Sequence, residues 1–599
     1  MCYNGTGCLK MYLRKSISNG KVYLSFVQGY RQDGKVKQKT IEKLGYLDDL
    51  LKDYADPIEH FRKVAKERSP VPEAMFSVDV SKRLKDQTDT RRNLGYVVPK
   101  RICNLLGINT FFQSKQRHLA IEYNLNKVFS LLIFNRFLFP SSIKKAYDSR
   151  KVFFETFDFS PDDVYRSLDY FSQYSQLLQK HLYTQVRNLI KIDNQLGYYD
   201  VTNFYFEIPY NDEDEYNKNG ELIKRGFRQK GPSKEHRPDP IVQMGLLMDA
   251  KGIPLAYDTF AGNESEKTSL LPIIRRVKKD YEIERIIVVA DRGLNTGDNT
   301  AFLTGVNDDD STGYDGYVYG QSVLGADKEF KAWVLKKEEY CSTKEIDKDG
   351  DEVLFTHKSR VFAKTIRLKN KTGMRTSKMT VYQKQMVYFS QKYADKQKNE
   401  RERVLAKARD LIKEPAKYTR ATSYGAAIYV KNIKFVKSTG EIAEGLDLSL
   451  DLEKIAEEEK YDGYYSIVTS EKRMSDKEIR DTYRGLWEIE ESFKIIKTEL
   501  KARPVYLKLE DHINAHFLIC FVTLLVIRVL EYMTGNKFSV GRIRESLIHY
   551  SCSYLEQNYF LFDYRDDVLK LMEETFQLDL SKKYMTTAEI KNILQYQKP

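Results

Sequence analysis

The sequence has few cysteines, no nucleotide-binding loop and no long apolar run. None of its six cysteines forms a Cys-x-x-Cys pair, which argues against a zinc ribbon and a disulfide framework. A G-x-x-x-x-G-K-[ST] loop is absent, which argues against an ATP-driven helicase. The longest nearly uninterrupted apolar run, residues 517–527, is much shorter than the about 20 residues that cross a bilayer, and the amino terminus lacks an apolar secretory core. These absences predict a cytoplasmic protein without a membrane partner.

The composition is that of a folded, basic protein. Hydrophobic residues make up 41% of the 599 residues and aromatic residues 13%, which is enough apolar surface to build several cores. Lys and Arg number 98 against 85 Asp and Glu, which leaves a net charge of +13. Residues 1–50 and residues 391–420 each carry an excess of five positive charges (9 − 4 and 10 − 5). Such segments suit a polyanionic partner, although charge runs are also found on ordinary solvated surfaces.

Local patterns divide the chain into several units. Two β-prone runs, residues 21–27 and 35–41, flank Asp33-Gly34, which predicts a hairpin. Apolar periodicity then predicts helices at 120–134 and 174–192. We predict six segments: 1–90 (β-hairpin and basic unit), 91–192 (helical DNA-binding domain), 193–305 (first part of a core), 306–460 (largely β insertion domain with a basic helix at 392–413), 461–535 (second part of the core) and 536–599 (C-terminal helical tail).

The core segments predict a mixed sheet and an α+β multidomain protein. Residues 197–207 alternate as a strand, with Asp200 on the face of Tyr198, Thr202, Phe204 and Phe206. Two further strands follow within 241–257, then a helix at 266–279 and a buried strand at 286–290 that ends at Asp291. A last core strand is predicted at 461–469. The order strand-strand-strand-helix-strand places one acid on the first strand and another at the end of the fourth.

A helix predicted at 476–500 carries a third acid. Its apolar stripe of Leu486, Ile489, Phe493, Ile496 and Leu500 has the spacing of a helix packed on a core. Tyr483, Glu490 and Lys497 are seven residues apart and form one row at the margin of that stripe. The row could hold a metal ion and its phosphate, or it could be the flank of an ordinary amphipathic helix.

Asp200, Asp291 and Glu490 thus come from three different elements. Mg²⁺ prefers oxygen ligands, so converging carboxylates would suit it. Two such ions could clamp the attacking and leaving oxygens of an in-line phosphoryl transfer.

The ordered series of motifs resembles the DDE (Asp-Asp-Glu) transposases of bacterial insertion sequences, in the group with a Tyr-Arg-Glu-Lys signature helix. The resemblance extends, with gaps, from about residue 195 to 530. The matching segments are 199–203 (YDVTN), 231–239 (GPSKEHRPD), 260–263 (FAGN), 289–293 (VADRG), 483–497 (YRGLWEIEESFKIIK) and 502–506 (ARPVY).

The resemblance implies an RNase H-like core in which Asp200, Asp291 and Glu490 are catalytic and bind two Mg²⁺ ions, with Mn²⁺ as a substitute. It also implies DNA contacts from Tyr483, Lys497, Arg484, Arg292, Lys234 and Arg237. The signature arginine position holds Leu486 instead, and Arg484 lies two residues earlier. Trp333 in the insertion could hold a flipped base or pack in a core.

The function expected from this resemblance is a transposase, working in the bacterial cytoplasm on the nucleoid. It would bind the terminal inverted repeats of its own element as a homodimer on paired double-stranded ends, cleave there and transfer the 3′-hydroxyls to target DNA. We expect residues 1–190 to provide most end recognition. Two alternatives remain open: a catalytically inert DNA-binding protein derived from such an enzyme, and a metal-dependent nuclease without strand transfer.

Overall fold

The computed structural model describes residues 8–595, apart from 19, 33–34, 69–80, 82, 84, 87, 193–194, 236, 306–314, 347–349, 351, 370–374, 421, 424, 437–439, 444 and 556–557. The chain forms two compact units. The first comprises Met1–Asp89 with Leu555–Asn558, and the second comprises Thr90–Tyr554 with Tyr559–Pro599.

The first unit is a three-stranded antiparallel sheet with its own core. The predicted pairing of the second and third strands is confirmed, while the turn residues Asp33 and Gly34 lie outside the described residues. Phe61 and Ala65 pack on Leu24 and Phe26 of the sheet. The Asp56 side chain caps the last helix by accepting hydrogen bonds from two backbone N–H groups. The elements are β1 (Cys8–Ser18), β2 (Lys21–Gln32), β3 (Lys35–Tyr46), α1 (Leu47–Leu50) and α2 (Pro57–Glu67).

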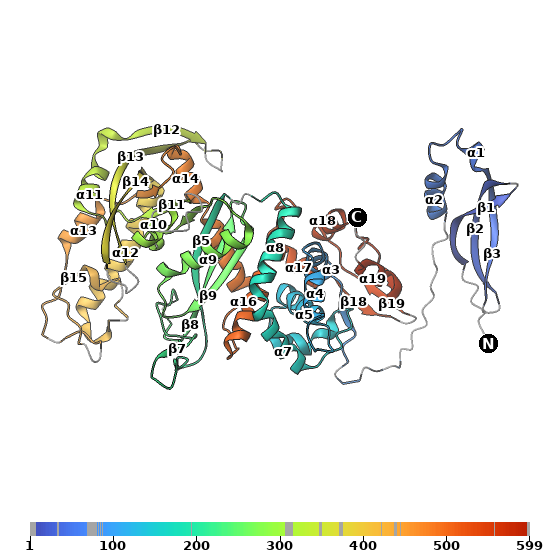
Figure 1. The fold of residues 1–599 in the computed structure, drawn as a ribbon, viewed down its shortest axis with the longest axis horizontal. Coiled ribbons are helices and arrows are strands. Elements are labelled where there is room, and N and C mark those ends of the chain that lie inside the picture. Colours follow the sequence, from blue (N-terminus) through green and yellow to red (C-terminus); the bar gives the residue numbers. More distant parts are fainter. Residues whose placement is uncertain are drawn as a thin grey trace. The chain divides into compact units, whose positions relative to one another are not determined.

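The second unit begins with the predicted helical segment (Figure 1). Its six helices do not have a separate core. Their buried apolar residues, apart from Tyr183, belong to one hydrophobic cluster with the central sheet and the long helix α16 (Glu510–Met533). This segment is therefore part of the larger unit. The helices are α3 (Val97–Leu105), α4 (Ile108–Gln116), α5 (Leu125–Leu138), α6 (Ile143–Asp148), α7 (Pro161–Gln173) and α8 (Ser175–Leu189).

A nine-stranded mixed sheet is the centre of the second unit. β5 pairs with β8 antiparallel and with β10 parallel, and β8 pairs with β9 antiparallel. A helix, α9 (Glu266–Tyr281), connects β9 to β10, so the predicted order of the first five core elements is confirmed. The strands are β5 (Leu196–Tyr205), β8 (Ile241–Asp249), β9 (Pro254–Ala261) and β10 (Ile287–Ala290).

The segment predicted as an insertion continues the same sheet. β11 (Gly316–Gln321) pairs parallel with β10, and β17 (Tyr464–Thr469) joins β11 to the ribbon of β13 (Glu352–Lys369) and β14 (Arg375–Phe389). β12 (Cys341–Ile346) forms the edge. Sequence patterns could not show this continuity, because pairing between distant strands is not encoded locally. The predicted basic helix is confirmed as α12 (Gln391–Lys413).

The two faces of the sheet belong to different hydrophobic clusters. On β5, Tyr198 and Phe204 lie in the cluster of the helices that follow β17, whereas Tyr199 and Val201 lie in the cluster of α9. The alternation predicted for this strand is therefore confirmed. Asp200 shares the face of Tyr198 and Phe204, which is the face covered by the predicted signature helix.

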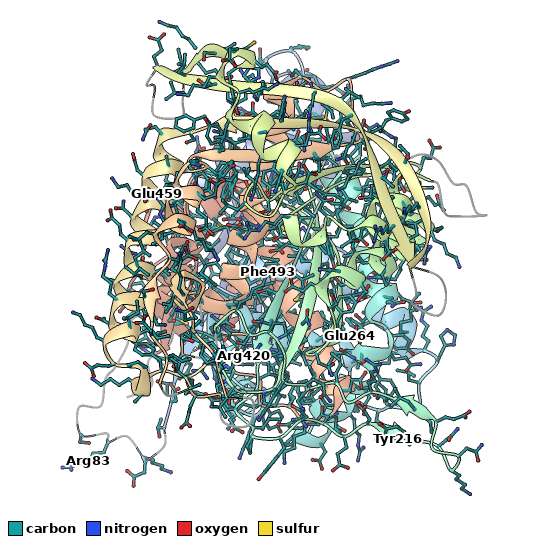
Figure 2. The ribbon with its side chains drawn as sticks, turned by 90° about the vertical axis from the view of Figure 1, so that its left-hand side faces the viewer. Arg83, Tyr216, Glu264, Arg420, Glu459 and Phe493 are labelled. Atoms are coloured by element: carbon teal, nitrogen blue, oxygen red, sulfur yellow. The ribbon has the colours of Figure 1, made fainter. Side chains whose placement is uncertain are left out.

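The signature helix is not one continuous helix, contrary to the prediction. It consists of α14 (Asp476–Arg484), α15 (Trp487–Lys494) and a π-helical turn at Ile495–Glu499. The break has a physical cause, because the Tyr198 hydroxyl donates a hydrogen bond to the Thr482 carbonyl at 2.9 Å and competes with the helix ladder there. The predicted apolar stripe is nevertheless buried, and Phe493 lies among packed side chains (Figure 2).

The C-terminal part closes this unit. α16 is long and apolar enough to cross a membrane, with a mean hydropathy of 2.2, but 89% of that stretch is buried inside the protein. It packs on α7, α5 and β9 as a core helix. The segment predicted as a helical tail also contains strands, and β18 pairs with β4 (Arg91–Asn93). Its elements are α17 (Val540–His549), β18 (Ser551–Tyr554), β19 (Tyr559–Phe562), α18 (Asp567–Phe576), β20 (Tyr584–Thr586) and α19 (Thr587–Leu594).

Candidate active site

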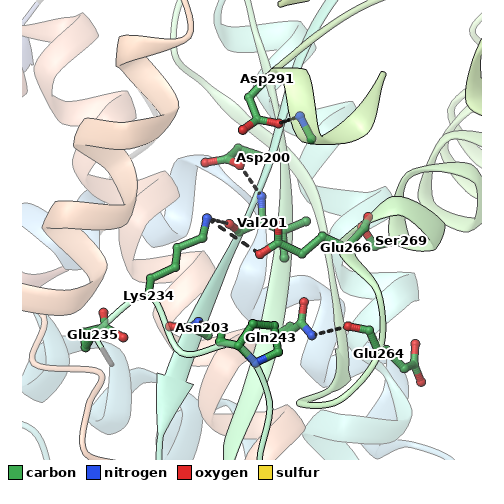
Figure 3. Close-up of polar contacts among 12 residues, drawn as sticks. Asp200, Val201, Asn203, Lys234, Glu235, Gln243, Glu264, Glu266, Ser269 and Asp291 are labelled. Atoms are coloured by element: carbon green, nitrogen blue, oxygen red, sulfur yellow. Dashed lines mark hydrogen bonds and ion pairs between the residues drawn. The ribbon is translucent and has the colours of Figure 1, made fainter. Parts of the chain in front are cut away.

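Asp200 and Asp291 lie next to each other on neighbouring parallel strands (Figure 3). The register of β5 and β10 pairs Tyr198 with Val289, and two residues further along each chain come Asp200 and Asp291. Parallel strands run in the same direction, so equal steps from a paired position keep the two acids level. Asp200 is half-buried and Asp291 is exposed.

Each carboxylate is held by one oxygen. Asp200 Oδ1 accepts a hydrogen bond from the Val201 N–H at 2.7 Å, and Asp291 Oδ1 accepts one from the Gly293 N–H at 2.7 Å. Within the described part of the chain, neither Oδ2 atom has a hydrogen-bond partner and neither acid forms an ion pair. These two oxygens are therefore available to a cation.

Burial raises the pKa of Asp200 to about 6. The Lys234 ammonium and the Val201 N–H act in the opposite direction, and the negative charges of Asp291 and Glu266 raise the pKa further. Glu266 is the first residue of α9 and forms an ion pair with Lys234 at 3.9 Å. Sequence reasoning missed Glu266, whose only signal was its position three residues after the 260–263 motif.

Glu490 lies on a helix rather than on the sheet. It is exposed on α15. Tyr483, on α14, lies near both Asp291 and Glu490, whose charges add to the effect of burial in raising the pKa of the phenol. The Tyr483 hydroxyl lies against Gly320 of β11, where a side chain would overlap it. The Tyr483 phenol is thus close enough to both Asp291 and Glu490 for their charges to affect it.

The three acids do not form a closed cluster. Among the described residues, no group of three or more His, Cys, Asp and Glu side chains is close enough together to hold a metal ion. Asp200 and Asp291 lie side by side at the sheet, while Glu490 lies on α15. The donor set still fits a hard divalent cation, because it offers carboxylate oxygens that no ammonium or guanidinium group of the described residues occupies.

A cluster of basic side chains lies beside this site. Lys497 donates a hydrogen bond to Glu235 at 3.2 Å, and the Arg503 guanidinium binds the same carboxylate oxygen. Lys234, next to Glu235 in sequence, places its ammonium on the Val201 carbonyl beside Asp200. Arg237 lies over the Tyr205 ring of β5 at 4.0 Å. We call Lys234, Arg237, Lys497 and Arg503 the basic cluster.

The basic cluster includes three of the predicted DNA contacts and one residue that was missed. Arg503 was not singled out, although it lies in the 502–506 motif that resembles the transposases. Burial lowers the pKa of Lys497, with Glu235 acting in the opposite direction. Burial also acts to raise the pKa of Glu235, but Lys497 and Arg503 outweigh it and hold that pKa below its usual value. The carboxylate therefore stays charged between the cations.

The remaining predicted DNA contacts lie elsewhere. Arg292 directly follows Asp291 and is exposed. Arg484 is exposed and lies near Tyr388 of β14, where burial raises the tyrosine pKa to about 12 and Arg484 opposes that rise. Arg484 therefore faces the ribbon strand rather than the basic cluster.

Trp333 is buried in a small core of α11 (Lys328–Leu335), β14 and neighbouring loops. Its Nε1–H donates to Glu339 at 2.7 Å, and Arg360 lies over its ring at 4.4 Å. Only 8% of the residue is exposed, so Trp333 packs in the core in this arrangement. The role of base clamp stays a prediction.

Comparison with known proteins finds a similarity in the first unit of the chain. Residues 13–73 match the model for the N-terminal domain of IS1634 family transposases, and this match begins within β1 and extends through β2, β3, α1 and α2. The comparison with curated proteins found no match. In its first unit, the chain is thus similar to the N-terminal domain of IS1634 family transposases.

Proposed function

We propose that the protein is a metal-dependent DDE transposase that cleaves at the terminal inverted repeats of its own element and transfers the 3′-hydroxyls to target DNA. Asp200, Asp291 and Glu490 are the proposed catalytic acids. The observation that carries the proposal is the pair of level aspartates, each with an oxygen that no described residue occupies, in a chain with a transposase N-terminal domain. The strand order and the mixed sheet support the RNase H-like core that the sequence resemblance implies.

The proposed chemistry divides between the acids and their basic neighbours. Two Mg²⁺ ions, or Mn²⁺ in their place, would supply activation of the attacking oxygen and stabilisation of the leaving oxygen. Asp200 and Asp291 would hold them from the sheet and Glu490 from α15. Lys497 and Arg503 would fix the phosphate backbone, since charge-assisted contacts to phosphate set the register of DNA on a protein. Tyr483 would position the strand between Asp291 and Glu490.

The experiment that tests the proposal is cleavage of end-containing DNA in Mg²⁺. Asp200→Ala, Asp291→Ala and Glu490→Ala should each abolish cleavage and leave DNA binding largely intact, because they remove cation ligands and no phosphate contacts. Glu491→Gln is the matched control, since Glu491 lies on the same helix and pairs with Lys494 at 3.3 Å. Full cleavage by one of the three alanine variants would remove that residue from the proposed triad.

One observation favours the inert alternative: among the described residues, Glu490 and the two aspartates do not form a group that could hold a metal ion. The same assay decides between the candidates. Wild-type protein without cleavage would support an inert binding protein, and cleavage without joined products would support a nuclease.

Assembly and location belong to the same proposal. Joining two ends in one event requires two active sites, so we expect a homodimer on paired ends in the bacterial cytoplasm, bound to the nucleoid. α16 is occupied by the protein's own core, so the dimer would use another surface. Light scattering with and without an end duplex should show monomer alone and dimer with DNA. A complex of one protein and one duplex that still performs strand transfer would contradict this assembly.

A further inference from the structure

A cavity of about 250 Å³ lies between the helical segment and the loop that follows the signature helix. Arg136 of α5 and His516 of α16 form its interior, and Lys501 and Arg503 line it from the loop. The described lining includes two arginines, one lysine and no carboxylate, although Arg503 also binds Glu235 outside the lining. None of these groups except Arg503 belongs to the basic cluster.

Arg136 is a buried cation with hydrogen-bonding capacity left over. Only 6% of it is exposed. Its Nη1 donates to the Leu500 carbonyl at 3.0 Å and to the Lys501 carbonyl at 3.3 Å, and Nη2 lies 3.5 Å from His516 Nδ1. The Nε–H is buried and has no hydrogen-bond partner among the described residues. A purely structural cap on the two carbonyls explains Nη1 but leaves this N–H unpaired, which is costly.

His516 does not add a charge. Burial, together with Arg136, lowers its pKa to about 3, so the ring is neutral. Its Nε2–H donates to the Ala502 carbonyl at 3.0 Å. Nδ1 then accepts from Arg136, and the histidine orients the guanidinium.

Lys501 brings a second unpaired cation to the cavity. It is exposed, and its ammonium forms no ion pair with any described residue. Its backbone has a φ of 46°, a left-handed conformation that lysine seldom adopts. The loop thus keeps a free ammonium beside the cavity at some conformational cost.

The cavity and the basic cluster share Arg503, so one anionic strand could reach both. Apolar groups such as Ile143, Pro504 and Leu507 form other parts of the wall. Apolar walls lower the local polarity, which strengthens attraction between an anion and the buried guanidinium.

We propose that this cavity binds a single phosphate group of the DNA backbone, with Arg136 and Lys501 as its two dedicated cations. The inference rests on the proposed DNA partner and is independent of the proposed cleavage chemistry. It gives the helical segment a direct role in holding DNA, although that segment lies in the same core as the catalytic sheet.

The test is the salt dependence of DNA binding by the full-length protein in EDTA, where no cleavage occurs. Each phosphate contact adds about 0.9 to the slope of log affinity against log salt concentration. Lys501→Gln should lower that slope by about one and weaken binding to any duplex at low salt, whereas Lys501→Arg should keep both. Lys508→Gln is the matched control, because Lys508 is exposed on the same loop but does not line the cavity.

A second variant separates the cavity from general surface charge. Leu507→Trp adds bulk to the cavity wall without changing any charge, and it should reduce the slope as Lys501→Gln does. An unchanged slope in Lys501→Gln, equal losses in Lys508→Gln, or a wild-type slope in a stably folded Leu507→Trp protein would each overturn the proposal. If Leu507→Trp does not fold, the contrast between Lys501→Gln and Lys508→Gln decides.

The failure of this inference can be told from the failure of the proposed function. Unchanged slopes with normal cleavage by the wild-type protein would overturn phosphate binding in the cavity alone. Absent cleavage with the expected slopes would overturn only the proposed cleavage chemistry.

Discussion

Tyr198 occupies the space that a side chain on Gly485 would need. The Tyr198 ring is buried on β5, and a Cβ built on Gly485 would overlap its hydroxyl and ring carbon. The same hydroxyl donates to the Thr482 carbonyl at the end of α14. This contact joins β5, which carries Asp200, to the end of α14, directly before α15, which carries Glu490.

The first prediction follows from that contact. Gly485→Ala should destabilise the protein by about 1–3 kcal/mol, because extra volume in a packed interior forces backbone shifts. Those shifts should also reduce DNA cleavage, since α15 would move away from β5. The measurements are thermal unfolding and cleavage rate. Gly541→Ala in α17 is the control, because a Cβ there meets no atom within 4 Å; equal stability of the two variants would contradict the role assigned to Tyr198.

The second prediction concerns pH and cation binding. Asp200 must lose its proton to bind a cation, and burial raises its pKa to about 6. Mn²⁺ binding should therefore strengthen as pH rises through about 6, and Asp200→Asn should bind Mn²⁺ more weakly with no step in that range. Isothermal titration calorimetry on wild type and variant measures both effects. A wild-type affinity that stays constant across this range would contradict the assignment.

The same shift predicts the pH dependence of stability without metal, which is the third prediction. The folded-state pKa of Asp200 lies above the ordinary value of 3.8, so the folded protein keeps this proton longer than the unfolded chain does. Between about pH 4 and about pH 6 the folded state binds more protons, and stability falls as pH rises. Relative to wild type, Asp200→Asn should become more stable across this interval in thermal unfolding with EDTA. No relative change would contradict the raised pKa.

The fourth prediction tests the basic cluster. Lys497→Gln should weaken DNA binding and lower its salt slope by about one, because the ammonium lies beside the proposed acids with Arg503. Lys494→Gln is the matched control, since Lys494 ends α15 just before the π-helical turn, is exposed and pairs with Glu491 outside the basic cluster. Binding isotherms at several salt concentrations measure the slope. Equal effects of the two substitutions would mean that the cluster is ordinary charged surface.

Local patterns were enough to predict the strand that carries Asp200, the strand that ends at Asp291 and the buried stripe around Glu490. Each depends on a period of two or of 3.6 within one element. The break after Arg484 was not predictable, because it depends on Tyr198, a residue nearly 300 positions earlier in the chain. The positions of Glu266 and Glu235 beside the site likewise come from tertiary packing. The continuation of the sheet into β12, β13 and β14 requires pairing that no local pattern specifies.

The last prediction revises the expected location of end recognition. We expected residues 1–190 to carry it, but helices α3 to α8 share their hydrophobic cluster with β5 and α16. A fragment ending at 190 would leave apolar residues such as Phe171 and Leu182 without their partners, so it should aggregate.

Residues 1–89 have their own core of Phe26, Phe61 and neighbours and should fold alone. Because residues 1–50 carry an excess of five positive charges, this fragment should bind DNA. Since it also resembles the N-terminal domain of IS1634 family transposases, we expect it to prefer the element's ends over random duplex. Circular dichroism and a gel shift measure folding and preference, and a folded fragment that binds both duplexes equally would place recognition in the second unit.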